Sequence, residues 1–327
     1  MSKEGRLLCP VGPLKIPTSS NLTVRLIDTM HHLNGSIKLC LLNPYRKIHK
    51  LAGCSQPLFN VHQLEAKWPG LIRMWVLFYV KYLKFGAVSI YDIDGSTEPY
   101  ISGLVEKGFI NYYKRWAPTE SMLNVSLNGS TYCAQTMMEN QCLWKHRGLS
   151  EWVMLIHSPD NFLNDFAGAP TLTAYLDSIQ HNTSLTLLTT LIFGHPNITI
   201  PKQQHANNLF KVIVSRACDP LRSHRHLPVA NPREVMMLFV HNAMAPFHKI
   251  PTTINNCSAK VNHYVTMFRV RSTDTSERNK TFCNDNTLYK KSRSYLSLLR
   301  DDHDAIKYNH TSEKFDIPFF VSENKTA

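Results

Sequence analysis

The chain has 327 residues, of which 43% are hydrophobic and 18% charged, and its formal net charge is +12. This composition is typical of a globular protein and excludes a disordered or fibrous chain. No apolar stretch is long enough to span a bilayer, and residues 1–10 lack the apolar segment of a signal peptide. The length allows one large domain or two ordinary ones.

Glycosylation sequons are more frequent than chance predicts. There are ten Asn-x-Ser/Thr sites, against about four expected from the composition. A sequon is normally used only on the surface of a lumenal or secreted chain. The excess therefore indicates the secretory pathway; the sites are Asn21, Asn34, Asn124, Asn128, Asn182, Asn197, Asn256, Asn279, Asn309 and Asn324.

The cysteine count is even, and no Cys-x-x-Cys pair is present, which disfavours a zinc ribbon. Disulfides are the preferred interpretation, although the sequence does not select a pairing; free thiols in a cytosolic protein are the alternative. We expect a lumenal protein of the secretory pathway whose N-terminal signal or membrane anchor this sequence lacks. The eight cysteines are Cys9, Cys40, Cys54, Cys133, Cys142, Cys218, Cys257 and Cys283.

The positive charge raises nucleic-acid binding as another possibility. The charge is spread along the chain, with its densest groups at residues 222–225 and 290–293, and no RNA- or DNA-binding motif occurs. A basic surface is equally suited to nucleotide diphosphates or to an anionic membrane. We therefore expect no nucleic-acid partner.

Strand and helix patterns alternate along the middle of the chain. Residues 1–52 are weakly patterned and predict a stem or a loosely packed cap, and residues 53–270 predict the main domain. Short connections between alternating strands and helices predict an α/β fold: a mostly parallel sheet with helices on both faces. The expected strands are 54–60, 87–92, 109–116 and 151–156, and the expected helices are 64–82, 97–108 and 130–146.

The later part of the chain is less regular. Residues 170–180 predict a helix and residues 185–193 a strand, while 210–215 and 235–241 are further strand candidates. After residue 271 the sequence is polar. Residues 271–327 therefore predict a C-terminal extension with one helix at 286–300.

Acidic residues follow two of the predicted strands. In open α/β sheets, ligands bind outside the carboxyl ends of the strands. Asp92 and Asp94 lie at such an end and could bind a nucleotide, and Asp160 follows strand 151–156 and could ligate a metal. The alternative for each is an aspartate that caps a turn or a helix.

Three histidines and one lysine complete the candidate set. His157, His241 and His263 each end or follow an apolar run and could bind a metal or a phosphate, or serve only as structural histidines. Lys211 precedes Val-Ile-Val and could face a diphosphate; a solvated lysine is the alternative. The usual serine-hydrolase, P-loop and dinucleotide-binding glycine motifs do not occur.

A series of short motifs, taken in order, resembles glycosyltransferase family 92 across roughly residues 54–300. Motifs similar to the family's strands and helices are Cys-Ser-Gln-Pro-Leu-Phe at 54–59, residues 78–91, residues 106–116, Asn-Gln-Cys-Leu at 140–143, residues 152–156, Lys-Val-Ile-Val at 211–214, Val-His at 240–241 and Asn-His-Tyr at 262–264.

The resemblance implies a GT-A-type fold, a Golgi membrane protein, and inverting transfer of a hexose from a UDP-sugar, by family implication UDP-galactose, to a glycan acceptor on a glycoprotein or glycolipid. Asp92, Asp94 and Lys211 would contact the nucleotide sugar. Asp160, with His157 or His241, would hold Mn²⁺ and the diphosphate. Asp160 is also the candidate catalytic residue, and His263 is a further candidate.

The sequence departs from the family at the metal-binding segment. The family's Asp-x-Asp-Glu-Phe corresponds here to His-Ser-Pro-Asp-Asn-Phe at 157–162. Fewer carboxylates should weaken Mn²⁺ binding, because hard cations prefer oxygen ligands. A family member without activity, retained as a lumenal binding protein, is therefore the alternative function.

Overall fold

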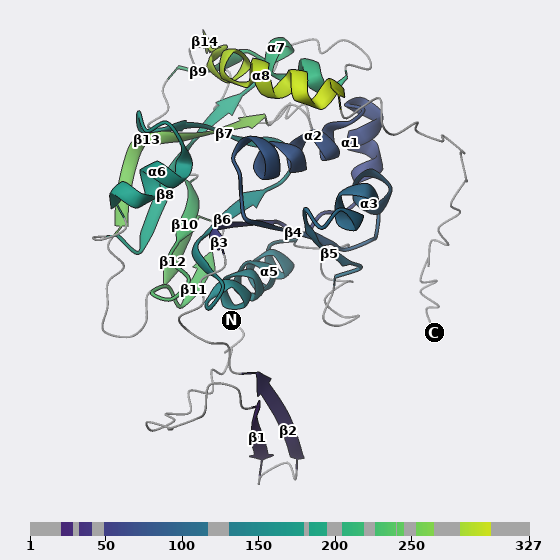
Figure 1. Ribbon diagram of the computed structural model, residues 1–327, viewed down its shortest axis with the longest axis vertical. Helices are drawn as coiled ribbons and strands as arrows, with labels where there is room; N and C mark the ends of the chain where they lie inside the picture. The colour runs from purple at the N-terminus through teal and green to yellow at the C-terminus, as the bar shows by residue number, and fades with distance from the viewer. Residues whose placement is uncertain are drawn as a thin grey trace, which may run out of the picture.

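The computed structural model describes residues 21–28, 33–40, 49–116, 131–179, 183–194, 205–218, 226–239, 241–244, 253–264 and 282–301. Within these residues the protein is a mixed α/β structure, built on a curled sheet of ten strands with helices on both faces (Figure 1). The predicted α/β class is confirmed.

Seven of the ten strands of the main sheet point in the same direction; β7, β9 and β10 oppose them. The sheet is therefore mostly parallel, as predicted. Its order is β14 (Phe282–Asn284), β9 (Ser215–Ala217), β8 (Leu185–Phe193), β10 (His226–Ala230), β6 (Ser150–His157), β3 (His49–Ser55), β4 (Ala87–Asp92) and β5 (Asn111–Lys114), with β13 (Thr253–Tyr264) paired to β8 and β7 (Asn161–Phe166) paired to β13.

The helices surround this sheet, and two small hairpins complete the described structure. The helices are α1 (Val61–Lys67), α2 (Leu71–Leu77), the π-helical η1 (Phe78–Tyr82), α3 (Glu98–Glu106), α5 (Thr131–His146), α6 (Leu172–Ile179), the 3₁₀ turn η2 (Ala206–Asn208), α7 (Leu209–Val212) and α8 (Thr287–Asp301). The hairpins are β1 (Asn21–Asp28) with β2 (Leu33–Cys40) and β11 (Met237–Phe239) with β12 (Asn242–Met244).

Each face of the sheet covers its own apolar core. Along β6, Trp152, Met154 and Ile156 belong to one core, while Val153 and Leu155 belong to the other. This alternation follows from the two-residue period of a strand, and burial on both faces explains the continuous apolar run in the sequence. The first core packs under α1, α2 and α8, and the second under α5.

The prediction of one continuous helix at 64–82 is wrong, because the helix is interrupted between Lys67 and Leu71. Gly70 has a φ of 84° and separates α1 from α2. The buried carboxylate of Glu65 accepts hydrogen bonds from the backbone N–H groups of Gly70 and Ile72, both at 2.7 Å. Glu65 thus satisfies donors at the start of α2 that lack helical partners. Apolar spacing continues across the break, so periodicity alone did not reveal it.

Other predicted boundaries also need correction. The first strand of the main sheet begins at His49, before Cys54. Residues 210–215 are mostly helical, since α7 covers Leu209–Val212 and β9 begins only at Ser215. Residues 237–239 form a strand of a separate hairpin, not of the main sheet. Strands β7, β10 and β13 were not predicted.

The helix predicted at 286–300 is confirmed as α8, and it packs against the first core. Leu288, Tyr295 and Leu296 are buried in the first core. The Tyr295 hydroxyl donates a hydrogen bond to the carbonyl of Met74, at 2.8 Å. The amphipathic α8 therefore closes the same core that the N-terminal helices build.

Among the described cysteines there are two disulfides, Cys54–Cys142 and Cys218–Cys283, and they are compatible with a secretory-pathway protein. The side chains of the ten sequon asparagines lie outside the described residues. No helix in the described ranges is long and apolar enough to cross a membrane.

Candidate functional site

The order of the parallel strands places a switch point between β3 and β6. From β3 the chain adds β4 and then β5 on one side, and β6 pairs with the opposite edge of β3. In such sheets the crevice outside the carboxyl ends of the two diverging strands is where ligands bind. Here these ends are joined, because the Gln56 N–H donates to the carbonyl of His157 at 2.9 Å.

The chain turns sharply where β6 ends. His157 has a φ of 53°, in the left-handed region that is uncommon for a residue with a side chain. The Asn161 N–H donates to the carbonyl of Ser158 at 3.0 Å, which closes a tight turn, and the chain returns as β7. This turn presents the side chains of residues 157–160 at the switch point.

Asp160 is the most heavily bonded side chain of this turn. It is buried, and its Oδ1 accepts hydrogen bonds from the Ser158 hydroxyl and from Asn161 Nδ2, the latter at 2.7 Å. Its Oδ2 lies 3.0 Å from His263 Nε2. The Tyr264 N–H donates to the Asp160 carbonyl at 2.8 Å, so β13 holds His263 in place. The structure thus brings together two residues proposed separately from the sequence.

The other two predicted histidines are neighbours as well. The rings of His157 and His241 stack with centroids 6.3 Å apart. Burial lowers the pKa of His157 to about 3, with further lowering by His241 and His263 and an opposing effect of Asp160. His157 is therefore neutral at pH 7, and its buried Nε2 has no hydrogen-bond partner in the described structure. We call His157, Asp160, His241 and His263 the switch-point cluster.

The switch-point cluster, as arranged, does not fit Mn²⁺. Both carboxylate oxygens of Asp160 already take hydrogen bonds, and the remaining donors are imidazoles. Mn²⁺ prefers several oxygen ligands. Among the described residues, a group of three or more potential ligands within 4.8 Å of one another is found instead at Cys54, Cys142 and His146. The role of Asp160, His157 and His241 as metal ligands therefore stays a prediction.

The acidic turn after β4 has two carboxylates with different surroundings. Asp92 is fully buried and accepts hydrogen bonds from the N–H groups of Gly95 and Thr97, both at 2.9 Å, and from the Tyr112 hydroxyl at 2.6 Å. Burial raises the pKa of Asp92, although the hydrogen bonds from Tyr112 and Thr97 oppose this shift. These contacts favour the alternative for Asp92, an aspartate that organises the turn and the start of α3.

Asp94 lies at the surface of the same turn. Its carboxylate accepts hydrogen bonds from the N–H groups of Ser96, at 2.9 Å, and Asn60, at 2.7 Å. These bonds hold the pKa of Asp94 below its usual value, against the effect of burial. They also tie the turn after β4 to the loop after β3. Asp94 remains a nucleotide-binding candidate by position.

Lys211 lies in a helix, whereas the sequence predicted a strand at this position. It lies in the last turn of α7, with an exposed side chain, rather than on a strand. Figure 1 shows α7 beside α8, whereas the acidic turn follows β4 near α3. The structure gives Lys211 no contact with the switch-point cluster or with Asp94.

Two further side chains were not singled out from the sequence. Phe59 follows β3 and is 41% exposed, next to Asn60 in a left-handed conformation. Glu139 on α5 is fully buried; burial raises the pKa of Glu139 to about 8, and only its Oε1 is bonded, by Gln135 Nε2 at 2.8 Å. An aromatic residue that follows a strand pattern can be recognised in the sequence. A buried glutamate on a polar-looking helix cannot.

Comparison with known proteins adds no relative. The chain matches no protein-family model, and no curated protein matches it significantly. The resemblance to family 92 thus rests on the order of short motifs.

Proposed function

We propose that this protein is a nucleotide-sugar-binding protein with a GT-A-like fold, and that it transfers a hexose from a UDP-sugar, with UDP-galactose as the first candidate, to a glycan acceptor. The observation that carries the proposal is the switch-point cluster, located where β3 and β6 diverge. The strand order β5-β4-β3-β6 matches the order 3-2-1-4 around the switch point of a doubly wound sheet.

Backbone geometry at the cluster supports a functional role. His157 combines a left-handed conformation, a buried side chain and a ring nitrogen without a hydrogen-bond partner among the described residues. Strained and unsatisfied residues of this kind are concentrated at binding and catalytic sites. Phe59 and Asp94 extend the same sheet edge, where an aromatic face and a carboxylate suit a nucleoside.

The chemistry assigned to the chain's own residues is limited to binding and proton transfer. Asp160 orients the His263 imidazole through Nε2, which leaves the other ring nitrogen to meet a phosphate oxygen or an acceptor hydroxyl. Mn²⁺, where bound, would neutralise the leaving diphosphate. Since the cluster does not fit that ion, no step is assigned to it.

Binding of the donor tests this proposal. The purified chain is titrated with UDP-galactose, UDP-glucose and UDP by calorimetry, with EDTA and with Mn²⁺, and ADP serves as the control nucleotide. Saturable binding of a UDP-sugar in preference to ADP is the expected result. If no UDP-sugar binds under either condition, the proposal is wrong.

A binding protein without transferase activity is the second candidate. The observation that favours it is the Asp160 carboxylate, whose two oxygens are engaged by Ser158, Asn161 and His263. Such a protein binds a UDP-sugar without turnover. Release of UDP in the presence of mixed glycan acceptors would exclude this candidate.

A further inference from the structure

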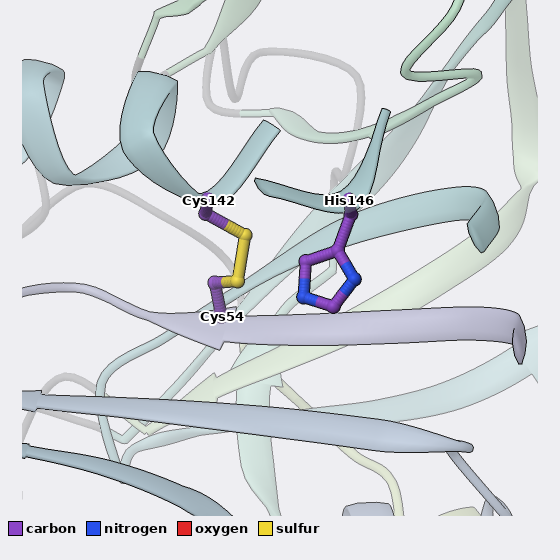
Figure 2. Close-up of side chains that lie close together, drawn as sticks. All are labelled: Cys54, Cys142 and His146. Atoms are coloured by element: carbon purple, nitrogen blue, oxygen red, sulfur yellow. A yellow bond between two sulfur atoms is a disulfide. The ribbon is translucent and has the colours of Figure 1, made fainter. Parts of the chain in front are cut away.

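A cysteine and a histidine share one face of α5. Cys142 and His146 are four residues apart, so their side chains project from the same side of the helix. That side faces β3, where Cys54 lies, and Figure 2 shows the three side chains together. One ligand atom from each residue lies within 4.8 Å of the other two, and all three residues are buried.

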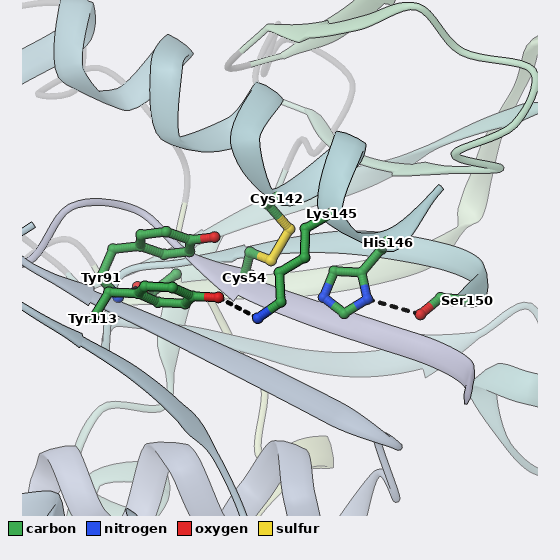
Figure 3. Close-up of a disulfide and its surroundings, with 8 residues drawn as sticks. Cys54, Tyr91, Tyr113, Cys142, Lys145, His146 and Ser150 are labelled. Atoms are coloured by element: carbon green, nitrogen blue, oxygen red, sulfur yellow. Dashed lines mark hydrogen bonds between the residues drawn. A yellow bond between two sulfur atoms is a disulfide. The ribbon is translucent and has the colours of Figure 1, made fainter. Parts of the chain in front are cut away.

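The His146 side chain has the orientation of a metal-binding histidine. Its Nδ1 lies 2.9 Å from the Ser150 hydroxyl, which fixes the ring. Its Nε2 is on the side of the ring toward the disulfide (Figure 3), is buried, and has no partner among the described side chains. The residue is only 1% exposed. A hydrogen bond to one ring nitrogen that leaves the other free is the arrangement found in metal-bound histidines.

We propose that Cys54, Cys142 and His146 form a redox-controlled zinc site: a disulfide in the oxidised chain and a Cys₂His ligand set for Zn²⁺ in the reduced chain. The two states are mutually exclusive, since both use the two sulfur atoms. Ligand atoms around a tetrahedral Zn²⁺ lie about 3.5–3.8 Å apart. The three ligand atoms here lie within 4.8 Å of one another, so small adjustments bring them to that spacing.

The conversion balances with a dithiol as reductant. The dithiol transfers two electrons and two protons to the Cys54–Cys142 bond, becomes a disulfide itself, and leaves two thiols. Zn²⁺ then binds both sulfurs and His146 Nε2, and two protons are released. The charge of the ion is cancelled by two thiolates, so the buried site becomes neutral.

Neighbouring groups favour this ligand set. Ser89 is the register partner of Cys54 on β4, and its buried hydroxyl finds no hydrogen-bond partner in the described part of the chain. It can donate to the Cys54 thiolate. Thiolates select Zn²⁺ over harder cations such as Mn²⁺.

The first experiment maps protection of the thiols. The full chain is reduced anaerobically with a phosphine, incubated with or without Zn²⁺, and alkylated, and each cysteine is quantified by mass spectrometry. We expect Zn²⁺ to slow the alkylation of Cys54 and Cys142 at least about tenfold. Cys218 and Cys283 form the other disulfide, far from His146 in sequence, and they serve as internal controls.

The second experiment measures affinity with Co²⁺ as a spectroscopic probe, followed by competition with Zn²⁺. Thiolate-to-cobalt absorption should saturate at one ion per chain. Ser150→Ala should lower the affinity by about 10–100-fold. His146→Ala, which removes the ligand itself, should lower it further. The double variant Cys218→Ser/Cys283→Ser should retain the signal.

Three outcomes would overturn the proposal. One is equal alkylation of Cys54 and Cys142 with and without Zn²⁺. Another is an unchanged affinity in His146→Ala. The third is a reduced wild-type chain that loses its near-ultraviolet dichroism and binds no metal. Because protection is read on the wild-type chain, a misfolded variant does not prevent a decision.

Discussion

His263 Nε2 lies 3.0 Å from Asp160 Oδ2, although the two residues are 103 positions apart in the chain. The contact exists because β13 pairs with β7, and β7 leads out of the turn that contains Asp160. It joins β13, near the end of the predicted main domain, to the strand end where the nucleotide sugar is proposed to bind.

Removing the charge of Asp160 should weaken UDP-sugar binding. Asp160→Asn retains the size of the side chain but loses the carboxylate that orients His263, and we expect an affinity loss of about tenfold or more, equivalent to about 1.4 kcal/mol. Calorimetric titration with UDP-galactose measures it. Asp177→Asn, an exposed aspartate paired with Lys50 on another part of the surface, is the control. Equal affinity in both variants would remove Asp160 from the site.

Asn161→Asp should give the switch-point cluster an affinity for Mn²⁺. Asn161 Nδ2 donates to Asp160 Oδ1 at 2.7 Å, so Asn161→Asp places two buried carboxylates in contact. Without metal their repulsion should lower the free energy of unfolding by about 2–3 kcal/mol. Mn²⁺ at about 100 times its dissociation constant should restore about 2.7 kcal/mol.

Urea unfolding with EDTA and with Mn²⁺ gives both values. Asn111→Asp, at an exposed position on β5, should respond to neither condition. If Mn²⁺ does not stabilise Asn161→Asp, the turn cannot bring its oxygens together around an ion.

The sequence predicted the part of the fold that local patterns determine. The apolar run of β6 and the helical period of α5 and α8 appear in the sequence because each element buries a continuous face. The break at Gly70 was missed because the capping group, Glu65, comes from the preceding helix. β10 and β13 are stabilised by partners distant in sequence, and no local signal marks them.

The candidate residues divide in the same way. Asp160, His157, His241 and His263 were found from their positions after apolar runs, and the structure places them together. Lys211 was misplaced because the short, mostly apolar segment 210–215 was taken for a strand, whereas α7 covers Leu209–Val212. The pairing of Cys54 with Cys142 depends on α5 crossing β3, which spacing does not reveal.

Asp92 should matter for stability rather than for nucleotide affinity. Its carboxylate accepts two hydrogen bonds from the N–H groups of Gly95 and Thr97 and one from the Tyr112 hydroxyl on β5. Asp92→Ala would remove the acceptor of all three donors. We expect a loss of about 2–4 kcal/mol in the free energy of unfolding. Tyr112→Phe, which removes one bond only, should cost about 1 kcal/mol. Denaturant titrations measure both, and a stable Asp92→Ala with weakened UDP-sugar binding would instead assign Asp92 to the ligand.

The Cys54–Cys142 disulfide should contribute substantially to stability. It links residues 88 positions apart, so it restricts a long loop of the unfolded chain. The double variant Cys54→Ala/Cys142→Ala should lose about 3–5 kcal/mol. Guanidinium unfolding of this variant and of Cys218→Ala/Cys283→Ala, whose loop is 65 positions, compares the two bridges. A loss below about 1 kcal/mol would mean that the unfolded chain is already compact around this segment.

Glu139 should make the protein less stable as the pH rises above neutrality. Burial raises the pKa of Glu139 to about 8 from 4.5, so the folded state keeps a proton that the unfolded state has released. The stabilising effect of low pH is therefore lost between pH 4.5 and 8, and from pH 6.5 to 8 the loss is about 1.5 kcal/mol. His146 and His157, whose pKa values are lowered, act in the opposite direction but only below about pH 6.5.

Glu139→Gln removes the titration and should flatten the stability profile between pH 6.5 and 8, as measured by urea unfolding at each pH. Glu106→Gln, at an exposed position on α3, should leave the slope unchanged. If the wild-type slope persists in Glu139→Gln, another buried acid is responsible.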